Sequence, residues 1–107
     1  MDRYAAIIDR LTRWARAEAG VQAALVVGSQ ARADHPADPY SDLDLVLVVD
    51  QPEAYLSDDA WLEGLGRLRI VFNERTVDGC WERRALFEGA LDVDIVLRDT
   101  ASARAML

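Results

Sequence analysis

The sequence predicts a single α/β domain in which a mixed β-sheet of about five strands is flanked by helices. Short runs of β-branched and apolar residues recur along the chain, each bounded by glycine, proline or polar residues, which is typical of strands. Residues 4–19 instead carry apolar side chains at helical spacing. A length of 107 residues allows one hydrophobic core, so we expect residues 1–107 to form one domain.

The composition indicates an acidic globular protein. Twelve Lys and Arg stand against 19 Asp and Glu, which gives a net charge of −7 and argues against long nucleic acid as a ligand. An acidic site can still bind an anionic nucleotide when divalent cations lie between them. Cys80 is the only cysteine, which excludes an internal disulfide. The first residues form neither a signal peptide nor a membrane span, so we expect a cytoplasmic protein without membrane contact.

The first half of the chain is predicted to form a helix and two strands. The helix covers residues 4–19, and Gly20 would end it by adopting a left-handed conformation. The short apolar run 21–27 predicts a buried strand. Residues 30–33 suggest a helical turn before a proline-containing loop, and residues 41–49, with their LVLVV segment, predict the second strand.

The middle of the chain is predicted to form a broken helix and a third strand. Apolar residues within 52–65 have helical spacing, interrupted near Ser57. Residues 67–72 alternate between arginine and apolar side chains, which predicts a strand. Residues 73–79 are polar and favour a turn.

The last part of the chain is predicted to form a hairpin of strands 81–87 and 91–97, followed by a helical fragment from Ala101. Arg83 and Arg84 are consecutive on the first of these strands. Alternation sends them to opposite faces of the sheet, so at most one can face an acidic site and the other is expected on the surface.

A candidate phosphate-binding bend follows the first strand at Gly28-Ser29. Gly28 lacks a β-carbon and lets backbone approach a phosphate, while Ser29 adds a hydroxyl donor where the next turn exposes unpaired amides. Arg32 is placed to reach a phosphate from that turn, although a solvent-facing helical arginine is an equal alternative.

Four aspartates form the candidate metal site. Asp42 and Asp44 are two residues apart on one strand, so both point to one face at about 7 Å spacing. Asp92 and Asp94 repeat this pattern on the last strand. Asp94 is the stronger third ligand because the apolar residues after it anchor its strand, but both can contribute.

Uncompensated carboxylates at one site repel one another and destabilise a fold, and divalent cations remove that repulsion. Two Mg²⁺ ions about 4 Å apart would bridge a triphosphate and stabilise a leaving pyrophosphate. The acidic site and the glycine-serine bend together therefore predict nucleotidyl transfer.

These motifs resemble a known superfamily. VVGSQAR, the twelve residues between Ser29 and Asp42, and SDLDLVLV are similar to the nucleotidyltransferase superfamily that includes DNA polymerase β. DHPADPYSDLD and ERRALFEGALDVDIVL resemble the N-terminal catalytic domain of aminoglycoside 6-adenylyltransferases, the streptomycin-modifying enzymes. The resemblance implies that Gly28 and Ser29 bind the phosphates of ATP, that Asp42 and Asp44 bind magnesium, and that Asp94 completes the triad and acts as base.

The resemblance also implies the reaction and its partners. AMP would pass from ATP to a hydroxyl of an aminoglycoside such as streptomycin, which is an antibiotic-resistance activity. Enzymes of this family continue into a C-terminal helical domain, and we expect no separate domain of this kind within residues 1–107. The alternatives are an antitoxin-type nucleotidyltransferase that modifies or binds a helical partner protein, a homo-oligomer, and a non-catalytic nucleotide-binding remnant.

Overall fold

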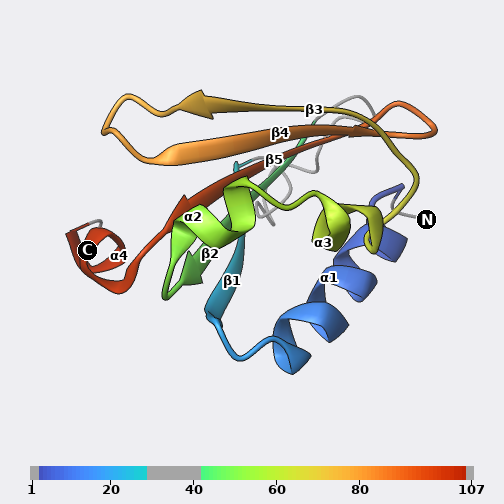
Figure 1. The fold of residues 1–107 in the computed structure, drawn as a ribbon. Coiled ribbons are helices and arrows are strands. Elements are labelled where there is room, and N and C mark those ends of the chain that lie inside the picture. Colours follow the sequence, from blue (N-terminus) through green and yellow to red (C-terminus); the bar gives the residue numbers. More distant parts are fainter. Residues whose placement is uncertain (1–2, 29–41, 106–107) are drawn as a thin grey trace.

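The computed structural model describes residues 3–28 and 42–105, which form a five-stranded sheet in the order β1-β2-β5-β4-β3 (Figure 1). β2 and β5 run parallel, and the other neighbouring strands are antiparallel. The predicted mixed sheet is therefore confirmed. The strands are β1 (Val21–Val27), β2 (Leu43–Val49), β3 (Leu68–Arg75), β4 (Trp81–Phe87) and β5 (Leu91–Arg98).

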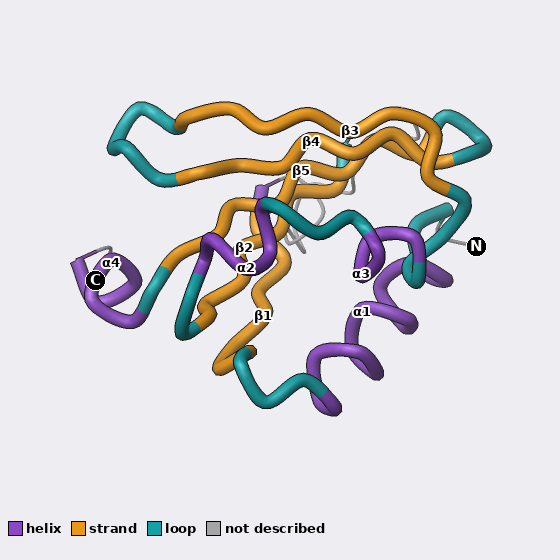
Figure 2. Tube along the Cα trace, viewed as in Figure 1, coloured by secondary structure: helices purple, strands orange, loops and turns teal. Residues whose placement is uncertain are grey.

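Three helices lie together beneath the sheet, as the ribbon and the tube both show (Figures 1 and 2). They are α1 (Ala5–Ala17), α2 (Pro52–Leu56) and α3 (Ala60–Glu63). The predicted break near Ser57 is confirmed, because the chain leaves helical geometry between α2 and α3. The terminal helix α4 (Thr100–Ala105) contacts β2 and β5. None of the helices in the described ranges is long and apolar enough to cross a membrane.

The hydrophobic core lies between these three helices and one face of the sheet. Alternate residues of the central strands point into it, as the two-residue period of a strand requires. Asp44 and Asp94 occupy the intervening positions and therefore point to the other face, which we call the open face. The fully buried strand residues include Leu43, Leu45, Leu47, Val49, Val93, Ile95, Ala85 and Phe87.

The explanation for the end of the first helix is wrong in one respect. Gly20 does not adopt a positive φ, unlike Gly28, Gly79 and Gly89. A β-carbon at Gly20 would instead collide with the hydroxyl of Tyr55 and lie 2.8 Å from Oδ1 of Asp50. Glycine at position 20 therefore leaves room for the side chains of Tyr55 in α2 and of Asp50 after β2, which approach it closely.

The third strand is longer than predicted. β3 continues to Arg75, because residues predicted as a turn pair with β4, Asn73 opposite Arg83 and Arg75 opposite Trp81. The register of β3 also shifts between Leu68 and Ile70. Such a bulge reverses the alternation, so Leu68 packs against the core while Ile70 is 57% exposed.

Arg83 corrects a second expectation, since it is buried rather than on the surface, with 3% of its area exposed. Its guanidinium donates hydrogen bonds to the carbonyl oxygens of Tyr55 (3.0 Å) and Asp58 (2.8 Å) and to Oδ1 of Asn73 (2.9 Å). It also forms an ion pair with Asp59. Arg83 thus links β4 and β3 to the segment that joins α2 and α3.

Candidate active site

The parallel pairing of β2 with β5 brings two of the predicted carboxylates together. Asp44 and Asp94 are direct cross-strand partners on the open face. On its other side Asp44 pairs with Val27, the last residue of β1, so the bend at Gly28 lies next to it. Asp42 immediately precedes β2 and is half-buried. The structure therefore places residues from β1, β2 and β5 around one point of the open face.

The charges of the four aspartates act on one another. The pKa of Asp44 is raised by burial first, and then by the negative charges of Asp94, Asp42 and Asp92. Burial also raises the pKa of Asp92, and Asp42 and Asp94 add to this effect. Both shifts mean that the ionised forms are disfavoured in the folded protein, mainly because of burial, and the repulsion expected from the sequence adds to this effect.

Gly28 suits its position in two ways, through its backbone conformation and through its close contact with Asp44. Its φ is +73°, in the left-handed region, and a β-carbon there would lie 2.5 Å from Oδ2 of Asp44. A side chain at this position would therefore push the Asp44 carboxylate out of place. Ser29 and Arg32, the other predicted phosphate-binding residues, lie outside the described residues.

The Gly28→Ala variant is expected to lose more stability than Gly79→Ala. Both glycines have positive φ, so alanine pays a backbone penalty of about 1–2 kcal/mol at each. Only Gly28 has the Asp44 contact, since nothing lies within 4 Å of a β-carbon at Gly79. Urea unfolding of both variants would measure the difference, and equal losses would show that the contact with Asp44 is relieved without strain.

Arg84 is the arginine that faces the acidic site. Its Nε donates a hydrogen bond to Oδ1 of Asp94 at 3.1 Å, and Nη1 lies 3.6 Å from Oε2 of Glu74. The hydrogen bond to Asp94 raises the pKa of the Arg84 guanidinium further. Arg84 therefore fixes the orientation of Asp94, whose side chain is only 14% exposed.

The structure adds carboxylates that the sequence interpretation missed. Glu82 and Glu74 face each other across β4 and β3. The pKa of Glu82 is raised by burial first and then by Asp94. The alternation of Glu82 with Arg84 on β4 was the available signal for a residue on the same face.

Asp92 differs from Asp94 in its surroundings. Asp92 lies two residues before Asp94, the cross-strand partner of Asp44, and is therefore further from Asp44. The backbone N–H of Asp92 donates a hydrogen bond to the hydroxyl of Tyr4 at 3.3 Å. Its carboxylate lines a pocket over β3, β4 and β5. By position, Asp94 is the better placed of the two to share a ligand with Asp44.

The residues present suit a divalent cation in their chemistry. Carboxylate oxygens are the ligands that Mg²⁺ prefers, and a cation would offset the repulsion that adds to burial in raising the pKa of Asp44. Within residues 3–28 and 42–105, no group of three or more Asp, Glu, His or Cys side chains is already arranged to hold a metal ion. Asp94 is paired with Arg84 instead.

Comparison with known proteins identifies the family of the chain. A family model described as streptomycin adenylyltransferase matches residues 1–106. The chain belongs to this family. The family resemblance predicted from the sequence motifs is therefore confirmed.

The adenylyltransferase fold is also found among solved structures. A crystal structure of an aminoglycoside 6-adenyltransferase from Bacillus subtilis matches with a TM-score of 0.71 and 16% identity, over 94% of this chain and 36% of that chain. At this identity the likeness shows the fold, and this chain spans about a third of the neighbour's length. A search of curated protein sequences finds no significant match.

Proposed function

We propose that this chain transfers AMP from ATP to a hydroxyl group of an aminoglycoside, streptomycin being the leading candidate. The observation that carries the proposal is the cross-strand pairing of Asp44 with Asp94 beside the bend at Gly28. The streptomycin adenylyltransferase family of the chain supports both the reaction and the acceptor class.

Each residue of the site has a proposed role. Asp42, Asp44 and Asp94 would hold two Mg²⁺ ions, with Asp92 as the weaker candidate. When bound, the ions supply positive charge to the triphosphate and to the leaving pyrophosphate. Gly28 lets the Asp44 carboxylate lie against the backbone of the bend, where a phosphate of ATP would bind.

The assignments of Ser29 and Arg32 as further phosphate-binding residues rest on the sequence alone.

The proposed reaction is a single displacement at the α-phosphorus of ATP. The acceptor hydroxyl oxygen forms a bond to this phosphorus, and the bond from the phosphorus to the oxygen that bridges the α- and β-phosphates breaks. Pyrophosphate leaves with that bonding pair, and the hydroxyl proton passes to a carboxylate. Asp94 is our candidate for this base, because Arg84 holds it in place through Oδ1.

An acidic open face suits a cationic acceptor. The electrostatic potential there is made negative by four carboxylates, those of Asp42, Asp44, Asp92 and Asp94. Arg84 is the neighbouring cation, and it pairs with Asp94. Aminoglycosides carry several positive charges and would be attracted to such a surface. Because the reaction consumes ATP, we propose that it takes place in the cytoplasm.

The experiment that tests the proposal is pyrophosphate release from ATP in the presence of Mg²⁺ and streptomycin. We expect Asp42→Asn to reduce the rate by about a hundredfold or more, since a charge that acts on the transition state is lost. Asp50→Asn is the matched control, because Asp50 is exposed at the opposite end of β2. Omitting Mg²⁺ should have the same effect as Asp42→Asn.

Two results would contradict the proposal. One is equal pyrophosphate release by the wild type and Asp42→Asn. The other is an AMP label found on a polypeptide instead of on streptomycin, which would support the alternative that the chain modifies a partner protein.

A further inference from the structure

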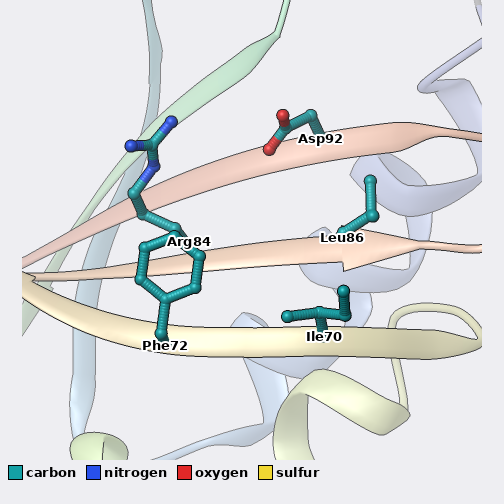
Figure 3. Close-up of a pocket in the computed structure, with 5 residues that line it drawn as sticks. All are labelled: Ile70, Phe72, Arg84, Leu86 and Asp92. Carbon is teal, nitrogen blue, oxygen red and sulfur yellow. The ribbon is translucent and has the colours of Figure 1, made fainter.

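A pocket of about 150 Å³ lies on the open face beside the carboxylates. Figure 3 shows its five lining side chains on the same side of β3, β4 and β5. Ile70, Phe72 and Leu86 form an apolar floor, with Arg84 and Asp92 at the edge toward β5. We call this the β3–β5 pocket.

The apolar floor is unusual for an exposed surface. Phe72 is 49% exposed and Ile70 is 57% exposed, and the bulge in β3 is what turns them away from the core. Each exposed apolar Å² costs about 25 cal/mol relative to burial. The guanidinium carbon of Arg84 lies 5.7 Å from the centre of the Phe72 ring, so one side of the ring is bordered by a cation.

The strand register fixes where the pocket lies relative to the reacting groups. Across the sheet, Asp44 pairs with Asp94, Asp94 with Arg84, and Arg84 with Phe72. Gly28 lies beyond Asp44 on the β1 side. The carboxylates therefore separate the phosphate-binding bend from the β3–β5 pocket, and a molecule in the pocket would approach them from the side opposite the triphosphate.

The pocket is too small for a whole acceptor of several rings. Sites that enclose drug-sized ligands measure about 300–1,000 Å³. A single ring with one charged substituent would use both kinds of lining, since ring carbons can contact an aromatic face while the substituent pairs with a carboxylate.

We infer that the β3–β5 pocket holds one amino- or guanidino-substituted ring of the acceptor, with the ring on Phe72 and Ile70 and the cationic substituent at Asp92. This inference rests on the proposed function and names the surface that selects its acceptor. The competing occupant is the nucleotide base. Charge favours the acceptor, because the base carries no positive charge to pair with Asp92.

The test compares Phe72→Ala and Ile70→Ala with Val77→Ala. Val77 is a fully exposed apolar residue in the turn joining β3 to β4, outside the pocket, and is the matched control. We expect each pocket variant to raise the KM for streptomycin about tenfold, with kcat changed less than about twofold. The reason is that the lost contact stabilises the bound substrate and the transition state equally. Phe72→Tyr keeps the ring and should restore most of the affinity.

A second measurement assigns the occupant. The Kd of a non-hydrolysable ATP analogue with Mg²⁺ should be the same in the wild type, Phe72→Ala and Ile70→Ala. Weaker binding of the analogue with an unchanged KM for streptomycin would overturn the inference and give the pocket to the base. An unchanged KM in both pocket variants would also overturn it, while the proposed function would stand.

A third outcome concerns the proposed function itself. If the wild type transfers no AMP to streptomycin, the proposed function fails and this inference fails with it.

The side chains of Phe72 and Ile70 are both about half exposed, so their truncation leaves the core intact. Circular dichroism of both variants should therefore show a wild-type fold.

Discussion

The Asp44→Asn variant is expected to lose AMP transfer by at least about a thousandfold while becoming more stable than the wild type without divalent cations. The activity falls because a metal ligand is worth several kcal/mol of transition-state stabilisation, and each 1.36 kcal/mol is a factor of ten. The stability rises because burial, Asp94 and Asp42 raise the pKa of Asp44, so its ionised form is disfavoured in the folded protein at neutral pH. Asparagine removes that charge.

Opposite changes in activity and stability distinguish a functional carboxylate from a structural one. Urea unfolding with and without Mg²⁺ measures the second change, and the wild type should gain stability from the ion while Asp44→Asn should not. Asp9→Asn is the control, because Asp9 forms an exposed pair with Arg13 on α1. A less stable Asp44→Asn protein in the absence of Mg²⁺ would mean that Asp44 is stabilising as a charge, and the repulsion argument would be wrong.

The backbone around these carboxylates is well suited to hold them still. Leu43 and Leu45 flank Asp44 in β2, and Val93 and Ile95 flank Asp94 in β5, and all four are buried in the core. Movement of either carboxylate along its strand would require repacking these side chains. The site is therefore positioned by the hydrophobic core on the opposite face of the same two strands, as precise catalytic geometry requires.

The sequence was sufficient to predict the strands that carry Asp44 and Asp94. In SDLDLVLV and LDVDIVL, aspartates alternate with apolar residues at the start and a continuous apolar run follows, and both features indicate strands, as β2 and β5 are. The hairpin of β4 and β5 was equally readable, because a short turn separates two apolar runs. The strands that carry Asp44 and Asp94 thus followed from local pattern.

The exceptions arise from contacts that local pattern does not contain. The bulge in β3 changes which face Ile70 and Phe72 occupy, and nothing in the alternation of residues 67–72 marks it. The close contacts at Gly20 come from Tyr55 and Asp50, which are 35 and 30 residues away. The pocket on the open face could not be predicted for the same reason.

Arg83 is the exception with the largest expected effect on stability. Its guanidinium bonds to two carbonyl groups, to Asn73 and to the carboxylate of Asp59, and these contacts attach the α2–α3 segment to β4. Arg83→Met keeps much of the side-chain volume but removes every donor. Because hydrogen bonds to charged groups contribute about 1.5–3 kcal/mol each, we expect the free energy of unfolding to fall by about 2–3 kcal/mol.

The estimate for Arg83→Met is lower than the sum of its bonds for two structural reasons. The carbonyl of Tyr55 keeps a second donor, Nε1 of Trp61 at 3.0 Å, and Asp59 is half exposed and can be solvated. Urea unfolding would measure the loss, with Arg69→Met as control, whose exposed pair with Glu88 is worth less than about 1 kcal/mol. If the two variants unfold alike, the α2–α3 segment is held by the packing of Trp61 and Leu62 against the core, and the buried guanidinium of Arg83 adds little to it.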